Sequence, residues 1–261
     1  MKIATVRLVA WTLAALGAAS LCYAQPRPAP TVRVAVYDFV EPDGYRTHLV
    51  GRRAAETVCL LLSERGRWEV VSRPALLRQC AVEGAVAPYA IAYVQMFGHR
   101  LQAPLALCGA VRSCVVNPAR GTVQVTLVGE LIETLDGGGL QSITTVGSAA
   151  RGRGETVALD ELVDRAIAEA AGDLVAALHN FDPVTAPVMA DVTEGKLILD
   201  AGRKVGLTPR AKMLAYRRQG ENWSFVAVLQ VQSVMEDLAH ATLLASDEGI
   251  RPNDVAVLVA R

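Results

Sequence analysis

The feature that most constrains the fold is a change of hydrophobic period late in the chain. Up to residue 178 the apolar residues follow alternating strand and helix patterns, whereas beyond residue 187 they recur mostly at every second position. Between the two, the segment NFDPVTAP holds two prolines and is typical of a linker. The sequence therefore predicts an α/β or α+β domain over 31–180, a linker over 181–187 and a small β domain over 188–261.

The clearest single element is a helix over 160–178. Its apolar residues step by three and by one without a break, and its charged residues take the opposite side, so we expect the apolar stripe to cover one face of a sheet. The stripe consists of Leu159, Leu162, Val163, Ala166, Ile167, Ala170, Ala171, Leu174, Val175 and Leu178.

The remaining patterns complete a mixed sheet packed by helices, followed by a barrel-like, SH3-like domain. In the first domain we expect strands over 31–39, 68–71, 105–116, 122–134 and 140–148, with helices over 48–65, 72–80 and 89–101. The run Asp136-Gly137-Gly138-Gly139 predicts a hairpin turn rather than a phosphate loop. In the second domain, five short strands are predicted over 196–200, 212–217, 224–233, 240–244 and 254–259.

The first 24 residues have the pattern of an export signal. Lys2 and Arg7 precede an uncharged apolar run over 8–21, and Ala24 offers a small-residue cleavage site. The run is too short for a comfortable membrane span, which needs about 20 residues. We expect a periplasmic protein, with lipidation of Cys22 and attachment to the outer membrane as an alternative.

Four cysteines follow the predicted signal: Cys59, Cys80, Cys108 and Cys114. An exported chain reaches an oxidising compartment in which disulfides persist, and four cysteines allow three pairings. If Cys108 and Cys114 share a strand, they lie about 20 Å apart, which is beyond disulfide reach. The sequence is compatible both with buried free thiols and with a disulfide.

Composition and motifs exclude several classes of function. The net charge is zero and aromatic residues make up 5% of the chain, which argues against nucleic-acid binding. The histidines stand alone, with no metal-binding spacing, and the acidic residues Asp160, Glu161 and Asp164 suit a helix N-terminus. No nucleophile signature occurs, so we expect no catalytic residue, no cofactor and no metal.

The first domain resembles the family of the curli-secretion channel protein CsgG and the TolB amino-terminal-like domains. The resemblance rests on 34–39 (VAVYDF), 70–73 (VVSR) and 105–111 (LALCGAV), followed by a hairpin and a long helix over 123–178. It implies the α/β fold predicted above. The chain has no long amphipathic hairpin insert, so the pore-forming role of the curli protein is not carried over.

The second domain resembles the carboxy-terminal domain of the flagellar assembly protein FlgT. The matching segments are 199–207 (LDAGRKVGL), 213–217 (MLAYR) and 250–255 (IRPNDV), in which Asn253 and Arg210 replace expected glycines. Together the two resemblances imply a periplasmic protein that acts by assembly and contact with other envelope proteins, including copies of itself, in building or secreting a flagellar- or curli-like surface structure.

Two further hypotheses concern specific residues. In the first, Trp223, Tyr216 and Phe225 form an aromatic surface of a module that binds peptidoglycan, another glycan or lipid. The simpler interpretation, which we favour, places Tyr216 and Phe225 in the barrel core. In the second, Asp38 follows a buried strand where α/β enzymes carry catalytic carboxylates, and the chain is a hydrolase. We consider a structural role the better interpretation of Asp38.

Overall fold

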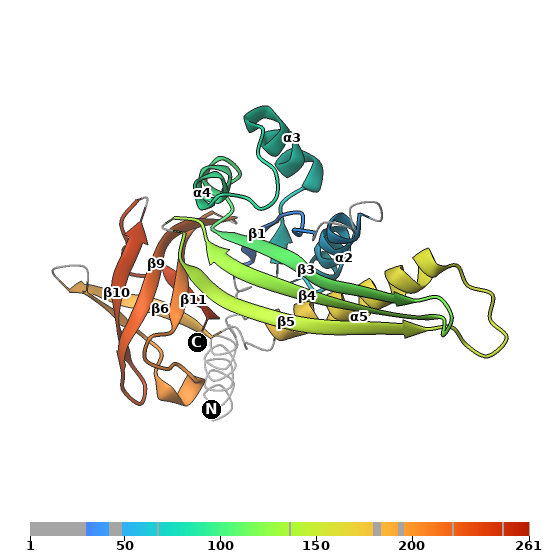
Figure 1. Cartoon of the computed structure of the whole chain (residues 1–261). Helices are drawn as coiled ribbons and strands as arrows, with labels where there is room; N and C mark the ends of the chain where they lie inside the picture. Colours follow the sequence, from blue (N-terminus) through green and yellow to red (C-terminus); the bar gives the residue numbers. More distant parts are fainter. Residues whose placement is uncertain are drawn as a thin grey trace, which may run out of the picture.

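The computed structural model of the chain describes residues 30–41, 49–66, 68–135, 137–179, 184–192, 196–220, 222–246 and 248–260. The predicted export signal over 1–24, including Cys22, lies outside these residues. Within them, the predicted fold class is confirmed: a mixed sheet packed by helices is followed by a closed barrel (Figure 1).

The sheet of the first domain combines parallel and antiparallel pairing. Its order among the described residues is β2 (Trp68–Val70), β1 (Val32–Val36), β3 (Leu105–Asn117), β4 (Thr122–Glu133) and β5 (Gly139–Ala150). β1 is parallel to both β2 and β3, whereas β3, β4 and β5 form an antiparallel meander. β1 is buried on both sides, as its nearly continuous run of apolar residues predicts.

Helices cover the two faces of this sheet unequally. On one face, α2 (Val50–Glu64) and α5 (Leu159–His179) form one apolar core with the inward residues of β3 and β4. On the other face, α3 (Arg73–Glu83) and α4 (Ile91–Arg100) cover β1 and the start of β3. The remainder of that second face, along β3, β4 and β5, extends away from both helices (Figure 1).

The second domain is a closed barrel of six described strands. Their order is β10 (Ala239–Ser246), β7 (Lys196–Leu199), β6 (Thr185–Val192), β11 (Val255–Ala260), β8 (Lys212–Gln219) and β9 (Asn222–Val234), with β9 pairing back to β10. A short 3-10 helix, η2 (Arg203–Val205), follows β7. The barrel interior is filled by small and medium apolar side chains such as Ala215, Leu229 and Leu258.

The prediction of five barrel strands was wrong by one. β6 begins at Thr185, inside the predicted linker over 181–187, and pairs with both β7 and β11. Pro187 lies within β6, opposite Val255. Because proline lacks the backbone N–H that a strand donates, a proline in the sequence argues against a strand, and this segment was therefore interpreted as a linker.

The two domains share one apolar core. Leu214, Val228 and Val257 point out of the barrel and belong to the same buried cluster as the core between α5 and the sheet. The barrel is therefore packed directly against the first domain. Among the described residues, no helix has both the length and the apolarity that crossing a membrane requires.

Candidate binding site between the domains

A cleft of about 670 Å³ lies at the junction of the two domains. The barrel contributes the facing ends of β8 and β9, and the first domain contributes the start of β1, β2, the end of α4 and the segments at the ends of the β3–β4 pair. Its lining comprises Thr31, Arg33, Glu69, Gly98, His99, Gln102, Ala103, Pro104, Thr134, Leu135, Tyr216, Gln219, Trp223, Ser224, Phe225 and Glu248.

The barrel side of the cleft carries the aromatic group singled out in the sequence. Tyr216 in β8 is paired with Phe225 in β9, and their ring centroids lie 5.9 Å apart in an edge-on arrangement. Trp223 and Phe225 are half-buried against the shared core. The prediction that Tyr216 and Phe225 fill the barrel core was wrong: side chains alternate along a strand, and here they point outward to the first domain.

Tyr216 is the most buried polar side chain of the cleft's barrel side. Its residue is 3% exposed, and its hydroxyl has no hydrogen-bond partner among the described residues. Burial, with a smaller contribution from the nearby carboxylate of Glu69, raises the pKa of the Tyr216 phenol, so the group stays protonated and can donate a hydrogen bond.

The first-domain side of the cleft is polar. Arg33 and Glu69 are cross-strand neighbours of β1 and β2, with Arg33 Nε 3.4 Å from Glu69 Oε1. His99 and Gln102 are exposed where α4 ends, and Thr134 donates from Oγ1 to the backbone oxygen of Ala103 at 2.8 Å. Apart from the aromatic trio, the sequence carries no signal for this site, since these residues come from segments far apart in the chain.

Asp38 lies outside this cleft and forms an ion pair with Arg73 at the start of α3. The Arg73 guanidinium also contacts the backbone oxygen of Val36 at 3.4 Å, so the pair ties the end of β1 to α3. Asp38 additionally borders a smaller cavity of about 340 Å³, together with Tyr89 and Cys108. An arginine-paired carboxylate at a strand end fulfils a structural role.

The acidic residues at the start of α5 are also paired with arginines. Asp164 Oδ1 accepts from Arg53 Nε at 2.8 Å, and Glu161 lies 2.9 Å from Arg165. Asp160 lies in the first turn of the helix, as predicted. Among the described residues, no group of three or more histidine, cysteine or acidic side chains could hold a metal ion.

All four described cysteines have free thiols. Cys108 and Cys114 share β3, as the sequence predicted, and Cys59, Cys80 and Cys114 are buried. Burial raises the pKa of each thiol, that of Cys108 to about 12. These groups are therefore protonated at neutral pH and are poor nucleophiles.

We expect the native protein to react very slowly with iodoacetamide at mildly alkaline pH. Iodoacetamide alkylates the thiolate, and both burial and the raised pKa values of Cys59, Cys80, Cys108 and Cys114 deplete it. Mass spectrometry of the protein labelled before and after denaturation checks this. Rapid labelling of any of the four in the native protein would contradict the burial described here.

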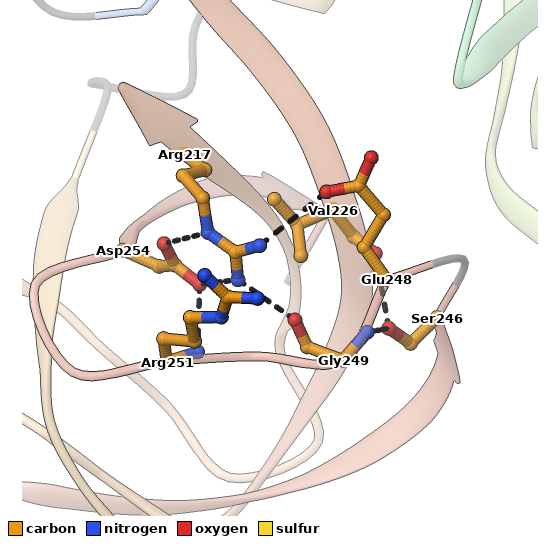
Figure 2. A network of polar contacts seen from close by, with 7 residues as sticks. All are labelled: Arg217, Val226, Ser246, Glu248, Gly249, Arg251 and Asp254. Carbon is orange, nitrogen blue, oxygen red and sulfur yellow. Dashed lines mark hydrogen bonds and ion pairs between the residues drawn. The ribbon is translucent and has the colours of Figure 1, made fainter. Parts of the chain in front are cut away.

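A second polar cluster links Arg217 in β8 to the loop before β11 (Figure 2). Arg217 in β8 binds Asp254 through two contacts, Nε to Oδ1 at 3.0 Å and Nη2 to Oδ2 at 2.8 Å. Asp254 also accepts from the backbone nitrogen of Arg251 at 2.7 Å, and Arg217 donates to the backbone oxygen of Gly249 at 2.8 Å. Arg217 is thus bound to both Asp254 and Glu248, and these contacts fix the loop before β11.

The fold and the cleft define a two-domain protein in which a closed barrel is packed on a mixed sheet, with a polar and aromatic cleft at their junction. The chain matches no protein-family model and no curated protein.

Several solved structures are similar to part of the chain. The PelC dodecamer from Paraburkholderia phytofirmans is 18% identical, with 56% of this chain and 91% of that chain covered and a TM-score of 0.35. Lipoprotein GNA1162 from Neisseria meningitidis is 16% identical, with 57% of this chain and 94% of that chain covered and a TM-score of 0.37. The LpoB C-terminal domain from Salmonella enterica is 12% identical, with 47% of this chain and 87% of that chain covered and a TM-score of 0.31.

Proposed function

We propose that this chain is a non-enzymatic, exported protein of the bacterial envelope, periplasmic or attached to the outer membrane, that supports assembly or secretion of a surface structure by binding other protein chains. The export pattern over 1–24 and the paired resemblance to the CsgG-like and FlgT-like domains support the location and the class. The observation that carries the protein-binding role is the free edge of the first domain's sheet.

That edge is the strand β5, which pairs only with β4 among the described strands and has a bulge at its start, between Gly139 and Gln141. Its twelve residues, GLQSITTVGSAA, contain no charged residue and no proline. Beyond the bulge, β5 therefore has neither the lysine nor the proline with which soluble proteins normally block a long edge strand. β5 therefore has the composition of a strand that pairs with another chain.

The register shows which backbone groups are available. Arg151 donates to the backbone oxygen of Gly121, so between Gln141 and Ala149 the odd-numbered residues of β5 bond to β4 and the even-numbered ones direct their backbone groups to the free edge. Of these, the Ser148 amide donates to the carboxylate of Glu169 at 2.6 Å. The open part of the edge is centred on Thr144 and Val146.

We assign a second copy of this chain as the occupant of the edge. In an antiparallel pairing about a two-fold axis, β5 meets an identical strand, so small uncharged side chains oppose one another and no charge is buried. A strand that pairs with β5 would have to be free of charged side chains, and β5 itself meets that requirement. The product is one sheet that continues across two protomers.

Val146→Lys should convert a dimer to a monomer. Val146 is 47% exposed on the open edge, so lysine is accommodated in the monomer, whereas two lysines meet near the axis of the dimer. Sedimentation velocity at micromolar concentration checks this, with circular dichroism to show that the fold is retained.

Val115→Lys is the matched control. Val115 is 56% exposed and lies on β3, an interior strand, so the same charge is added away from the edge. The control should stay dimeric. A monomeric wild-type protein, or equal dissociation by both variants, overturns the pairing of β5 with a second copy. A wild-type monomer that forms a stoichiometric complex with another purified envelope protein through β5 would replace the second copy as occupant.

The same two variants test the role in the cell. In a strain lacking this chain, Val146→Lys should fail to restore the surface structure, whereas Val115→Lys should restore it, as judged by electron microscopy and by secretion of the structural subunit. Restoration by both variants would separate the function from edge pairing and overturn the proposal.

A further inference from the structure

We propose that the cleft between the domains is a saccharide-binding site. This assignment goes beyond the protein contacts proposed above and does not depend on them. The juxtaposition that carries it is an aromatic group on the barrel, Trp223 with Phe225 and Tyr216, facing hydrogen-bonding side chains on the first domain across a space of about 670 Å³.

The cleft offers both kinds of contact that a sugar ring needs. Each sugar ring has an apolar face of C–H groups, which packs on an aromatic ring, and a rim of hydroxyls that donate and accept hydrogen bonds. Trp223 and Phe225 are half-buried and therefore present part of their rings to the cleft. Gln219 and Gln102 are exposed on opposite sides and supply amide donors and acceptors.

The Tyr216 hydroxyl is the second, independent observation. It is buried, it has no partner among the described residues, and its residue lines the cleft. Leaving a buried hydroxyl unpaired is costly, and a ligand hydroxyl in the cleft would satisfy it. Tyr37 also carries a buried hydroxyl without a described partner, but it lies under α3 and α4 and does not line the cleft.

The charge of the cleft selects an uncharged ligand. Of the described residues that line it, Arg33 is the only arginine or lysine, and it is paired with Glu69. Glu248 adds a further carboxylate, which lies 3.4 Å from Arg217. Phosphate groups and anionic lipid headgroups bind where unpaired arginine or lysine side chains gather, so this lining disfavours them.

The volume of the cleft, about 670 Å³, lies within the range of about 300–1,000 Å³ typical of small-ligand sites.

Calorimetric titration with two neutral oligosaccharides tests the assignment. An oligomer of β-1,4-linked N-acetylglucosamine represents the backbone chemistry of peptidoglycan, and an oligomer of β-1,4-linked glucose represents an exopolysaccharide. We expect at least one to bind the full-length protein, and the tighter of the two identifies the source. Trp223→Ala should weaken binding by about tenfold or more, because it removes the stacking face.

Two further variants separate binding from folding. Tyr216→Phe keeps the ring and its packing but removes the hydroxyl, so affinity should fall about threefold to tenfold. Tyr37→Phe removes an equally unpaired hydroxyl elsewhere and should leave affinity unchanged. Both phenylalanine variants should raise the melting temperature of the ligand-free protein, since each removes an unsatisfied buried group.

Gln219→Ala covers the case in which Trp223→Ala fails to fold. Gln219 is exposed, so its loss leaves the barrel intact, and affinity should fall about threefold. Binding of neither oligosaccharide overturns the assignment. Binding that is unchanged by both Tyr216→Phe and Gln219→Ala also overturns it, because the sugar would then bind elsewhere on the molecule.

Discussion

Gly147→Ala should lower the free energy of unfolding by about 3 kcal/mol. Gly147 lies in β5 directly beneath α5, and a Cβ there would overlap the backbone oxygen of Ala166 and lie 2.5 Å from the backbone nitrogen of Ala170. Both atoms belong to a helix backbone, so no side chain can rotate away to make room. The helix must move off the sheet, which loosens the core that the stripe of α5 builds.

Gly139→Ala in the same strand is the control. Apart from its chain neighbours, no atom of the described residues lies within 4 Å of the position of its Cβ, so the substitution should leave stability unchanged or raise it by up to about 1 kcal/mol. Urea unfolding followed by circular dichroism measures both variants. If Gly147→Ala is as stable as Gly139→Ala, α5 does not pack on β5 as closely as described here.

Arg217→Met should lower the free energy of unfolding by about 3–5 kcal/mol. The substitution preserves much of the side chain's length and apolar stem but removes the partner of Asp254, a residue that is 3% exposed. The carboxylate then stays buried with the Arg251 amide as its remaining described donor. An uncompensated buried charge costs far more than the loss of a surface ion pair.

Arg218→Met separates this effect from the loss of any arginine in β8. Arg218 is exposed and donates only to the backbone oxygen of Gly220 among the contacts described, so its replacement should change stability by less than about 0.5 kcal/mol. Thermal unfolding compares the two variants. Equal stabilities would show that the bidentate contact to Asp254 contributes nothing to the barrel.

Most elements of this fold were predictable because their signals are local. The stripe of α5 needs only the spacing of apolar residues within one segment, and the observed helix, Leu159–His179, extends the predicted one by a single residue at each end. The long hairpin of β4 and β5 was marked by its run of glycines.

β6 escaped prediction because its signal is not local. Pro187 and the neighbouring Thr-Ala are typical of a linker, and only pairing with β7 and β11 turns this segment into a strand. The backbone oxygen of Pro187 accepts from Asp200 at 2.9 Å, so the residue that lacks a donor still takes part in the barrel.

Only the barrel side of the cleft could be predicted from the sequence. Tyr216, Trp223 and Phe225 are close in sequence, so their grouping could be anticipated, although their orientation could not. Orientation depends on which face of β8 and β9 meets the first domain, and strand alternation alone does not decide that. Arg33, Glu69 and Gln102 join them only because the barrel is packed against the amino-terminal ends of β1 and β2.

Because β11 pairs with both β6 and β8, the barrel cannot close until this strand, near the end of the chain, has been made. β11 lies about 70 residues after β6 along the chain, so the barrel closes through one of its most distant contacts, and such closure is slow. Until β11 is added, the facing edges of β6 and β8 stay open, while the other barrel strands already pair with one another. A chaperone that shields those two edges would then be needed during synthesis but not afterwards.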